Sequence, residues 1–98
     1  MAENVEDLTV TWTEDGIDTV KELDKIVLTK GAWSTIIYRY QDYNRGTQEY
    51  GPDKYTIRRY QKRNGVYRQQ SKFNISSKAQ ALSIIEALQT WIGDEEDK

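Results

Sequence analysis

Apolar and polar residues alternate along most of residues 24–76, and this period of two predicts β-strands. The predicted strands are 24–31, 33–44, 54–63 and 66–76, and the second is rich in β-branched and aromatic residues. Glycines and the single proline mark 45–53 as a loop, and Asn64-Gly65 is a strong signal for a tight hairpin turn. The pattern therefore predicts four antiparallel strands in sequence.

The period lengthens to that of an α-helix after residue 76. Ser77 and Gln80 form a Ser-x-x-Gln capping box at the start of this segment, and Gly93 marks its end. Apolar residues cover a wide stripe of the predicted helix, more than one sheet face needs. The remainder of the stripe fits either a dimer contact or a thicker core, so the pattern predicts an α+β fold in which four strands precede one C-terminal amphipathic helix.

The chain of 98 residues has the length of one domain. We assign 25–93 to a single β-β-β-β-α domain and 94–98 to an acidic tail. Residues 1–24 form an acidic arm or an extra hairpin, because 8–13 alternate as a strand does and Asp15-Gly16 fits a turn. The acidic ends are expected to fold back and compete for any basic surface.

The composition excludes several classes of function. The sequence has neither cysteine nor histidine, so we expect no metal site, no cofactor and no thiol or imidazole chemistry. Acidic residues cluster near the ends rather than in facing pairs, and no phosphate-binding glycine motif occurs, so we expect no catalytic residues and no enzyme. No apolar run is long enough to span a membrane and the N-terminus is acidic, which predicts an intracellular protein without a membrane anchor, cytoplasmic and nucleoid-associated in a prokaryote or nuclear in a eukaryote.

Charge is distributed unevenly along the chain. Residues 1–24 carry eight acidic residues and one lysine, 25–78 carry twelve Lys/Arg and three acidic residues, and 79–98 carry five acidic residues and one lysine. A basic middle of +9 is thus bracketed by acidic ends, although the net charge of the whole chain is only −2.

Counting in twos along the strands sorts these charges onto faces. We take the apolar sets as the core face: Ile26, Leu28, Ile36, Tyr38, Tyr40, Tyr55, Ile57, Phe73 and Ile75. The opposite face then holds Arg39, Gln41, Tyr43, Lys54, Arg58, Tyr60, Lys62, Arg68, Gln70, Lys72 and Asn74. No acidic residue occurs in this second set, whereas a merely solvated surface mixes charges of both signs.

Single-stranded nucleic acid is the ligand that such a face fits best. Lysine and arginine neutralise phosphates, and tyrosine rings accept unpaired bases. We expect phosphates on Arg39, Lys54, Arg58, Lys62, Arg68 and Lys72, bases on Tyr43 and Tyr60, and weak sequence selectivity. Duplex binding is less favoured because the predicted helix is not basic. A protein-interaction module that recruits an acidic partner is the alternative.

Three segments resemble the single-stranded-DNA-binding domain of the transcriptional positive-cofactor-four family, whose plan the Whirly and Pur-alpha-like proteins share. "IRRY" (57–60) resembles the Ile-Arg-x-Tyr of the family's third strand, "KFNISSKAQALSIIEAL" (72–88) its last strand end and helix, and "YRYQDYN" (38–44) its second strand. The resemblance spans about residues 25–92.

It implies a curved antiparallel sheet, a homodimer joined through the helices, and a transcription or DNA-maintenance cofactor. Arg58 and Lys72 would contact the nucleic-acid backbone, with Tyr43 and Arg45 beyond the second strand. The dimer interface would include Leu88, Trp91 and Ile92.

Overall fold

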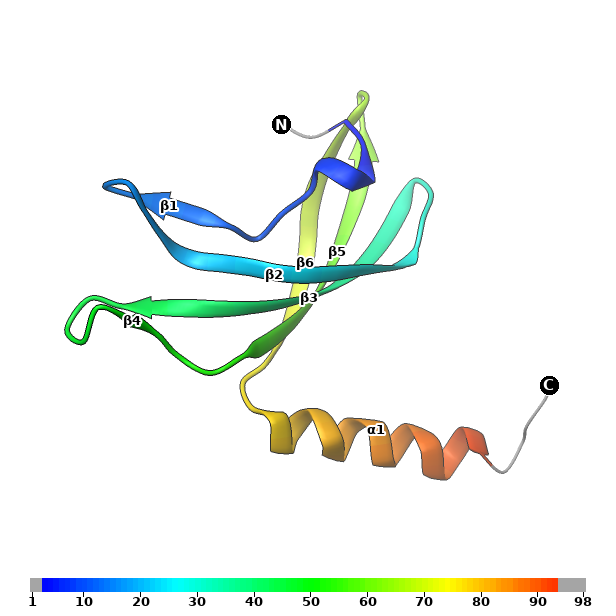
Figure 1. Ribbon diagram of the computed structural model, residues 1–98. Coiled ribbons are helices and arrows are strands. Elements are labelled where there is room, and N and C mark those ends of the chain that lie inside the picture. The colour runs from blue at the N-terminus through cyan, green and yellow to red at the C-terminus, as the bar shows by residue number, and fades with distance from the viewer. Residues whose placement is uncertain (1–2, 94–98) are drawn as a thin grey trace.

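One curled antiparallel sheet and one C-terminal helix make up the fold, seen in a computed structural model that describes residues 3–93 (Figure 1). The strands are β1 (Trp12–Glu14), β2 (Ile17–Thr29), β3 (Trp33–Asn44), β4 (Glu49–Tyr50), β5 (Lys54–Arg63) and β6 (Val66–Ile75). A short 3-10 helix, η1 (Val5–Asp7), precedes them and α1 (Lys78–Ile92) follows. The predicted α+β class, with a curved antiparallel sheet followed by one helix, is confirmed.

The predicted number of four strands is wrong, because the sheet has six. Its order is β1-β2-β3-β5-β6, with β4 paired to the end of β3. The first extra strand arises at Asp15-Gly16, where both residues have positive φ and turn β1 back onto β2. Because β2 begins at Ile17, it continues without a break through residues 24 and 25. The acidic tail 94–98 lies outside the described residues.

The β5–β6 hairpin forms as the sequence predicts. Asn64 and Gly65 both have positive φ, at 53° and 81°, which is the requirement of the tight turn that matches the twist of two antiparallel strands. The same strand pair contains a β-bulge between Arg59 and Tyr60, where the register of the two strands shifts. β6 is the last strand of the sheet, so its outer edge has no neighbouring strand among the described residues.

The two faces of the sheet differ from the predicted ones, because each side chain of β3 lies on the face opposite to the predicted one relative to β2 and β5. Ile37, not Ile36, lies opposite Ile26 on one side and Ile57 on the other. Ile36 instead shares a face with Arg58, its partner across β3 and β5. The sequence permits this because residues 36–38 are apolar in succession, so either phase of β3 buries apolar side chains.

The core lies on the face of the sheet that the N-terminal arm (residues 4–11) covers, and we refer to this as the arm face. Seven residues form this core: Val5, Leu8, Val10, Ile36, Tyr38, Tyr60 and Tyr67. Lys25 fastens the arm, since its Nζ donates hydrogen bonds to the carbonyl oxygens of Val5, Glu6 and Leu8 at 3.1, 2.9 and 2.6 Å. Residues 5–10 are therefore part of the packed structure and do more than carry acidic charge.

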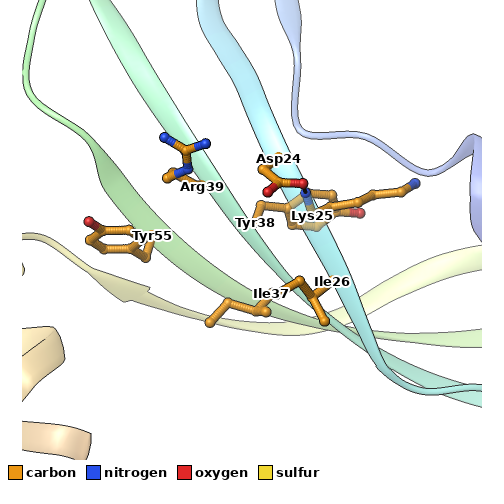
Figure 2. A pocket seen from close by; sticks show the side chains of 7 residues that line it. All are labelled: Asp24, Lys25, Ile26, Ile37, Tyr38, Arg39 and Tyr55. Carbon is orange, nitrogen blue, oxygen red and sulfur yellow. Dashed lines mark hydrogen bonds between the residues drawn. The ribbon is translucent and has the colours of Figure 1, made fainter.

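The other face, which we call the open face, is largely uncovered within the described part of the chain. Figure 2 shows Ile26, Ile37, Arg39 and Tyr55 around a shallow pocket of about 190 Å³ on this side of β2, β3 and β5. Ile26, Leu28 and Phe73 are each at least half exposed. Helix α1 begins just after the end of β6 and lies apart from the strands in Figure 1, and these residues stay exposed.

Candidate nucleic-acid interface

The nine residues expected to bind nucleic acid do not form one surface. The register places Lys54, Arg58 and Lys72 on the arm face, opposite Tyr40, Ile36 and Arg58 respectively. Arg39 lies on the open face opposite Tyr55, and Arg68 lies opposite Gln61 on that same face. The single basic face predicted from alternation is therefore wrong: the reversed phase of β3 moves Arg39, and the bulge between Arg59 and Tyr60 moves Arg68 to the other face from Lys72.

Three of the expected cations are paired with carboxylates. Arg39 Nη1 lies 3.1 Å from Asp53, and Lys54 Nζ lies 2.8 Å from Asp42. The hydrogen bond to Asp42 raises the pKa of Lys54, while hydrogen bonds from Gln41 and then Arg39 lower the pKa of Asp53. These two cations are largely neutralised where they stand, and so carry less of any attraction for phosphate.

Arg45 is the third paired cation. It lies in the loop after β3 and its Nη2 is 3.5 Å from Glu14. Both side chains are about half exposed, so this pair is weak and easily exchanged for another anion. The nearby Tyr43 is half-buried and packs edge-on against Tyr50, with ring centroids 5.1 Å apart. Its ring is accordingly engaged with a neighbouring aromatic at the far end of β3.

The cations of the β5–β6 hairpin are different. Six of them have no carboxylate within 4.0 Å in the part of the chain that the structure describes: Arg58, Arg59, Lys62, Arg63, Arg68 and Lys72. Residues 54–75 contain no acidic residue at all, so neither strand offers a local partner. The excess of basic residues in the middle of the chain is thus concentrated on this hairpin.

Two of these cations face each other directly. Arg58 and Lys72 are opposite residues in the β5–β6 register and lie on the same face. Like charges at such a position destabilise a sheet, because the side chains are close and repel. The Arg58 guanidinium is held by hydrogen bonds to Gln69 Oε1 at 2.9 Å and Thr56 Oγ1 at 3.4 Å, while Lys72 is exposed. The arrangement places a hydrogen-bonded arginine and an exposed lysine side by side on one face.

Tyr60 does not fit the stacking role expected of it. Its side chain is only 5% exposed, lies in the core beneath the arm, and shares a hydrogen bond of 2.9 Å with the Tyr38 hydroxyl. Burial, followed by this hydrogen bond, raises the pKa of Tyr38 well above its usual range. Bases cannot reach the Tyr60 ring while the arm is in place, and alternation alone gave no sign of the arm.

Other aromatic and basic side chains gather at the turn end of the hairpin. Lys62 lies over the Tyr67 ring at 5.3 Å, and Arg59 lies over the Trp33 ring at 4.6 Å. Sequence reasoning missed Arg59 and Arg63 because it assigned the odd-numbered positions of β5 to a buried core, and it assigned Trp33 to neither face. A signal was present, since Arg63 directly precedes the Asn64-Gly65 turn and Trp33 lies opposite Gln61 near that turn.

The residues expected at a dimer interface are exposed. Leu88, Trp91 and Ile92 lie on α1 with Trp91 71% exposed, and only Ala81 and Ile84 of this helix are half-buried. The structure contains one chain and places no partner on this stripe.

Comparison with protein-family models, with curated proteins and with solved structures finds no match for this chain. Among the described residues, no helix is long and apolar enough to cross a membrane.

Proposed function

We propose that this protein binds single-stranded nucleic acid, with weak sequence preference, through the β5–β6 hairpin. The observation that carries the proposal is the set of six hairpin cations without a carboxylate partner in the described residues, whereas Lys30, Arg39, Arg45 and Lys54 each have one. The facing pair Arg58 and Lys72 is the centre of this site. Phosphates would relieve a repulsion that the fold otherwise leaves in place.

A single strand suits this surface better than a duplex. Double-helical DNA is commonly read by a basic helix or a free two-stranded ribbon in the major groove, whereas Lys78 is the only cation of α1 and the β5–β6 ribbon is joined to β3 along its β5 edge. The hairpin instead offers cations and amides along an open edge, with aromatic rings at the turn. The resemblance of residues 57–60 and 72–88 to the positive-cofactor-four domain supports the same ligand, and with it a role as a transcription or DNA-maintenance cofactor.

A homodimer formed through α1 is part of this proposal. The exposed stripe of the helix contains Leu82, Ile85, Leu88, Trp91 and Ile92. An apolar stripe of this extent on a helix that barely contacts its own sheet calls for a covering partner. A second copy presents the same stripe, so the two helices can cover each other about a twofold axis.

The test of the proposed function is the salt dependence of binding to a labelled oligo(dT), followed by fluorescence anisotropy. Each phosphate neutralised on a single strand contributes about −0.7 to the slope of log K against log salt. We expect Arg58→Gln and Lys72→Gln each to weaken binding and to make this slope shallower by about 0.7. Lys54→Gln is the matched control, because Asp42 already neutralises that lysine and its removal should change the slope less.

An unchanged slope in both hairpin variants contradicts the assigned site. Absence of oligo(dT) binding by the wild-type protein contradicts the function itself and favours an acidic protein partner for the same cations.

A further inference from the structure

The turn end of the hairpin carries an exposed tryptophan among arginines on the open face, away from Arg58 and Lys72. Trp33 opens β3 and lies opposite Gln61, while its neighbour on the same face, Thr35, lies opposite Arg59. Trp33 and Arg59 therefore share a face, and their side chains stack at 4.6 Å. The tryptophan is still 43% exposed, so the arginine covers only part of its ring.

Two further arginines complete this cluster. Arg68 lies opposite Gln61, and Arg63 is the last residue of β5, two positions beyond Gln61 on the same face. Neither has a carboxylate within 4.0 Å in the described residues, and Glu6 of η1 is paired with Lys30, in the turn that precedes Trp33, at 3.4 Å. We call Trp33, Arg59, Arg63 and Arg68 the tryptophan corner.

We propose that the tryptophan corner is the base-stacking subsite for the single strand, with Trp33 as the platform and its three arginines as phosphate contacts. This inference rests on the proposed function and supplies what the buried Tyr60 cannot, an aromatic face that a base can reach. An indole ring accepts any base, and a guanidinium beside it stacks on the same ring system while contacting a phosphate.

The path between the two sites crosses the edge of the sheet. β6 is the last strand, and its exposed residues Gln69 and Gln70 separate Lys72 from Arg68 along that strand. A strand held by Arg58 and Lys72 on the arm face can pass over this open edge and reach Arg68 and Trp33 on the open face. The nucleic acid then contacts both faces of the hairpin, which explains why the hairpin cations are distributed over both faces.

A cation–π pair that only stabilises the turn is the competing explanation of Trp33 and Arg59. The two explanations differ in what they predict for a ligand without bases. Stacking needs a base, whereas a purely structural tryptophan would act on any anionic strand through the same cations.

The experiment measures the affinity of wild type, Trp33→Ala and Trp33→Phe for two labelled strands, oligo(dT) and an abasic strand of equal length. We expect Trp33→Ala to lose about 5- to 100-fold in affinity for oligo(dT), with Trp33→Phe in between. Binding of the abasic strand should change little, and the salt slope should be unaltered because the indole carries no charge. Trp12→Ala is the matched control, since Trp12 is 61% exposed on β1 and distant from the hairpin along the sheet.

Wild-type affinity for oligo(dT) in Trp33→Ala overturns the inference and leaves the proposed function standing. An equal loss for both strands also overturns it, because the tryptophan would then act through the fold. If the wild-type protein binds neither strand, the proposed function fails, and this inference fails with it.

Discussion

Leu8 offers a sharp test of the packed N-terminal arm. Its side chain is 8% exposed and lies in the core cluster with the tyrosines of β3, β5 and β6. Truncating a buried leucine to alanine costs about 2–5 kcal/mol, the larger values applying where the surroundings cannot collapse. The arm lies at the margin of the core and can relax, so we expect Leu8→Ala to lower the free energy of unfolding by about 2–3 kcal/mol. A domain of this length is stable by only about 5–15 kcal/mol, so this loss is large.

Urea unfolding followed by tryptophan fluorescence, at one fixed protein concentration, measures this loss. With a slope of about 1–2 kcal/mol per molar, the midpoint should fall by about 1–3 M urea. Leu28→Ala is the matched control, because Leu28 is 51% exposed and should lose less than half as much. A loss below about 1 kcal/mol for Leu8→Ala, or losses equal in the two variants, would show that the arm does not pack on the sheet.

Three further predictions follow from particular contacts. Burial raises the pKa of Tyr38, so the folded protein keeps this phenol protonated while the unfolded chain ionises it near pH 10. The free energy of unfolding should therefore be unaffected below that pH and about 1.4 kcal/mol lower at about pH 11. Urea unfolding at the two pH values measures this loss, and Tyr38→Phe should not show it. Ser77 accepts a hydrogen bond from the Gln80 amide at 3.1 Å, so Ser77→Ala should cost about 1 kcal/mol in urea unfolding, whereas Ser83→Ala, on the exposed surface of α1, should cost less. Leu88→Asp should halve the mass seen by light scattering while Gln89→Asp leaves it unchanged, and a monomeric wild-type protein would contradict the proposed dimer.

The parts of the fold that the sequence predicted are those that local signals determine. The turn at Asn64 and Gly65 needs positive φ at both positions, and these residue types supply it wherever the rest of the chain lies. The helix likewise begins at Ser77 because its side chain caps a backbone amide within the same turn. By contrast, the turn alone would place Ser71 opposite Arg58, and the bulge between Arg59 and Tyr60 shifts the register so that Lys72 lies opposite Arg58.

The phase of β3 could not be predicted in this way. Ile36, Ile37 and Tyr38 are apolar in succession, so alternation gives two equally good phases for this strand. The choice between them depends on the neighbours: Ile37 joins Ile26 and Ile57 on the open face, while Ile36 and Tyr38 meet the arm. The wrong phase for β3 placed Arg39 on the same face as Arg58 in the prediction. Residues of two different faces were thus predicted to form one surface.

The arm was equally invisible to local reasoning. Val5, Leu8 and Val10 are three apolar residues among acidic and polar ones, and the alternation of residues 8–13 predicted a strand there rather than an arm packed on the sheet. They are buried because the tyrosines of the arm face need cover and because Lys25 binds the carbonyl oxygens around them. Because the arm also covers Tyr60, that ring is not available to a ligand. The segment that packs on a face of a sheet thus determines which of its side chains can bind.

The central claim is that the hairpin cations bind a single strand. The measurement that tests it most directly compares labelled oligo(dT) of about 20 nucleotides with its duplex at low and at physiological salt, by fluorescence anisotropy of the wild-type protein. If all six unpaired cations contact phosphates, the slope of log K against log salt is about −4, and affinity for the single strand falls about 300-fold between roughly 50 and 200 mM salt. Tight, steeply salt-dependent binding of the single strand with much weaker binding of the duplex is the predicted result. Equal affinity for the two, or no binding to either at low salt, would contradict the account.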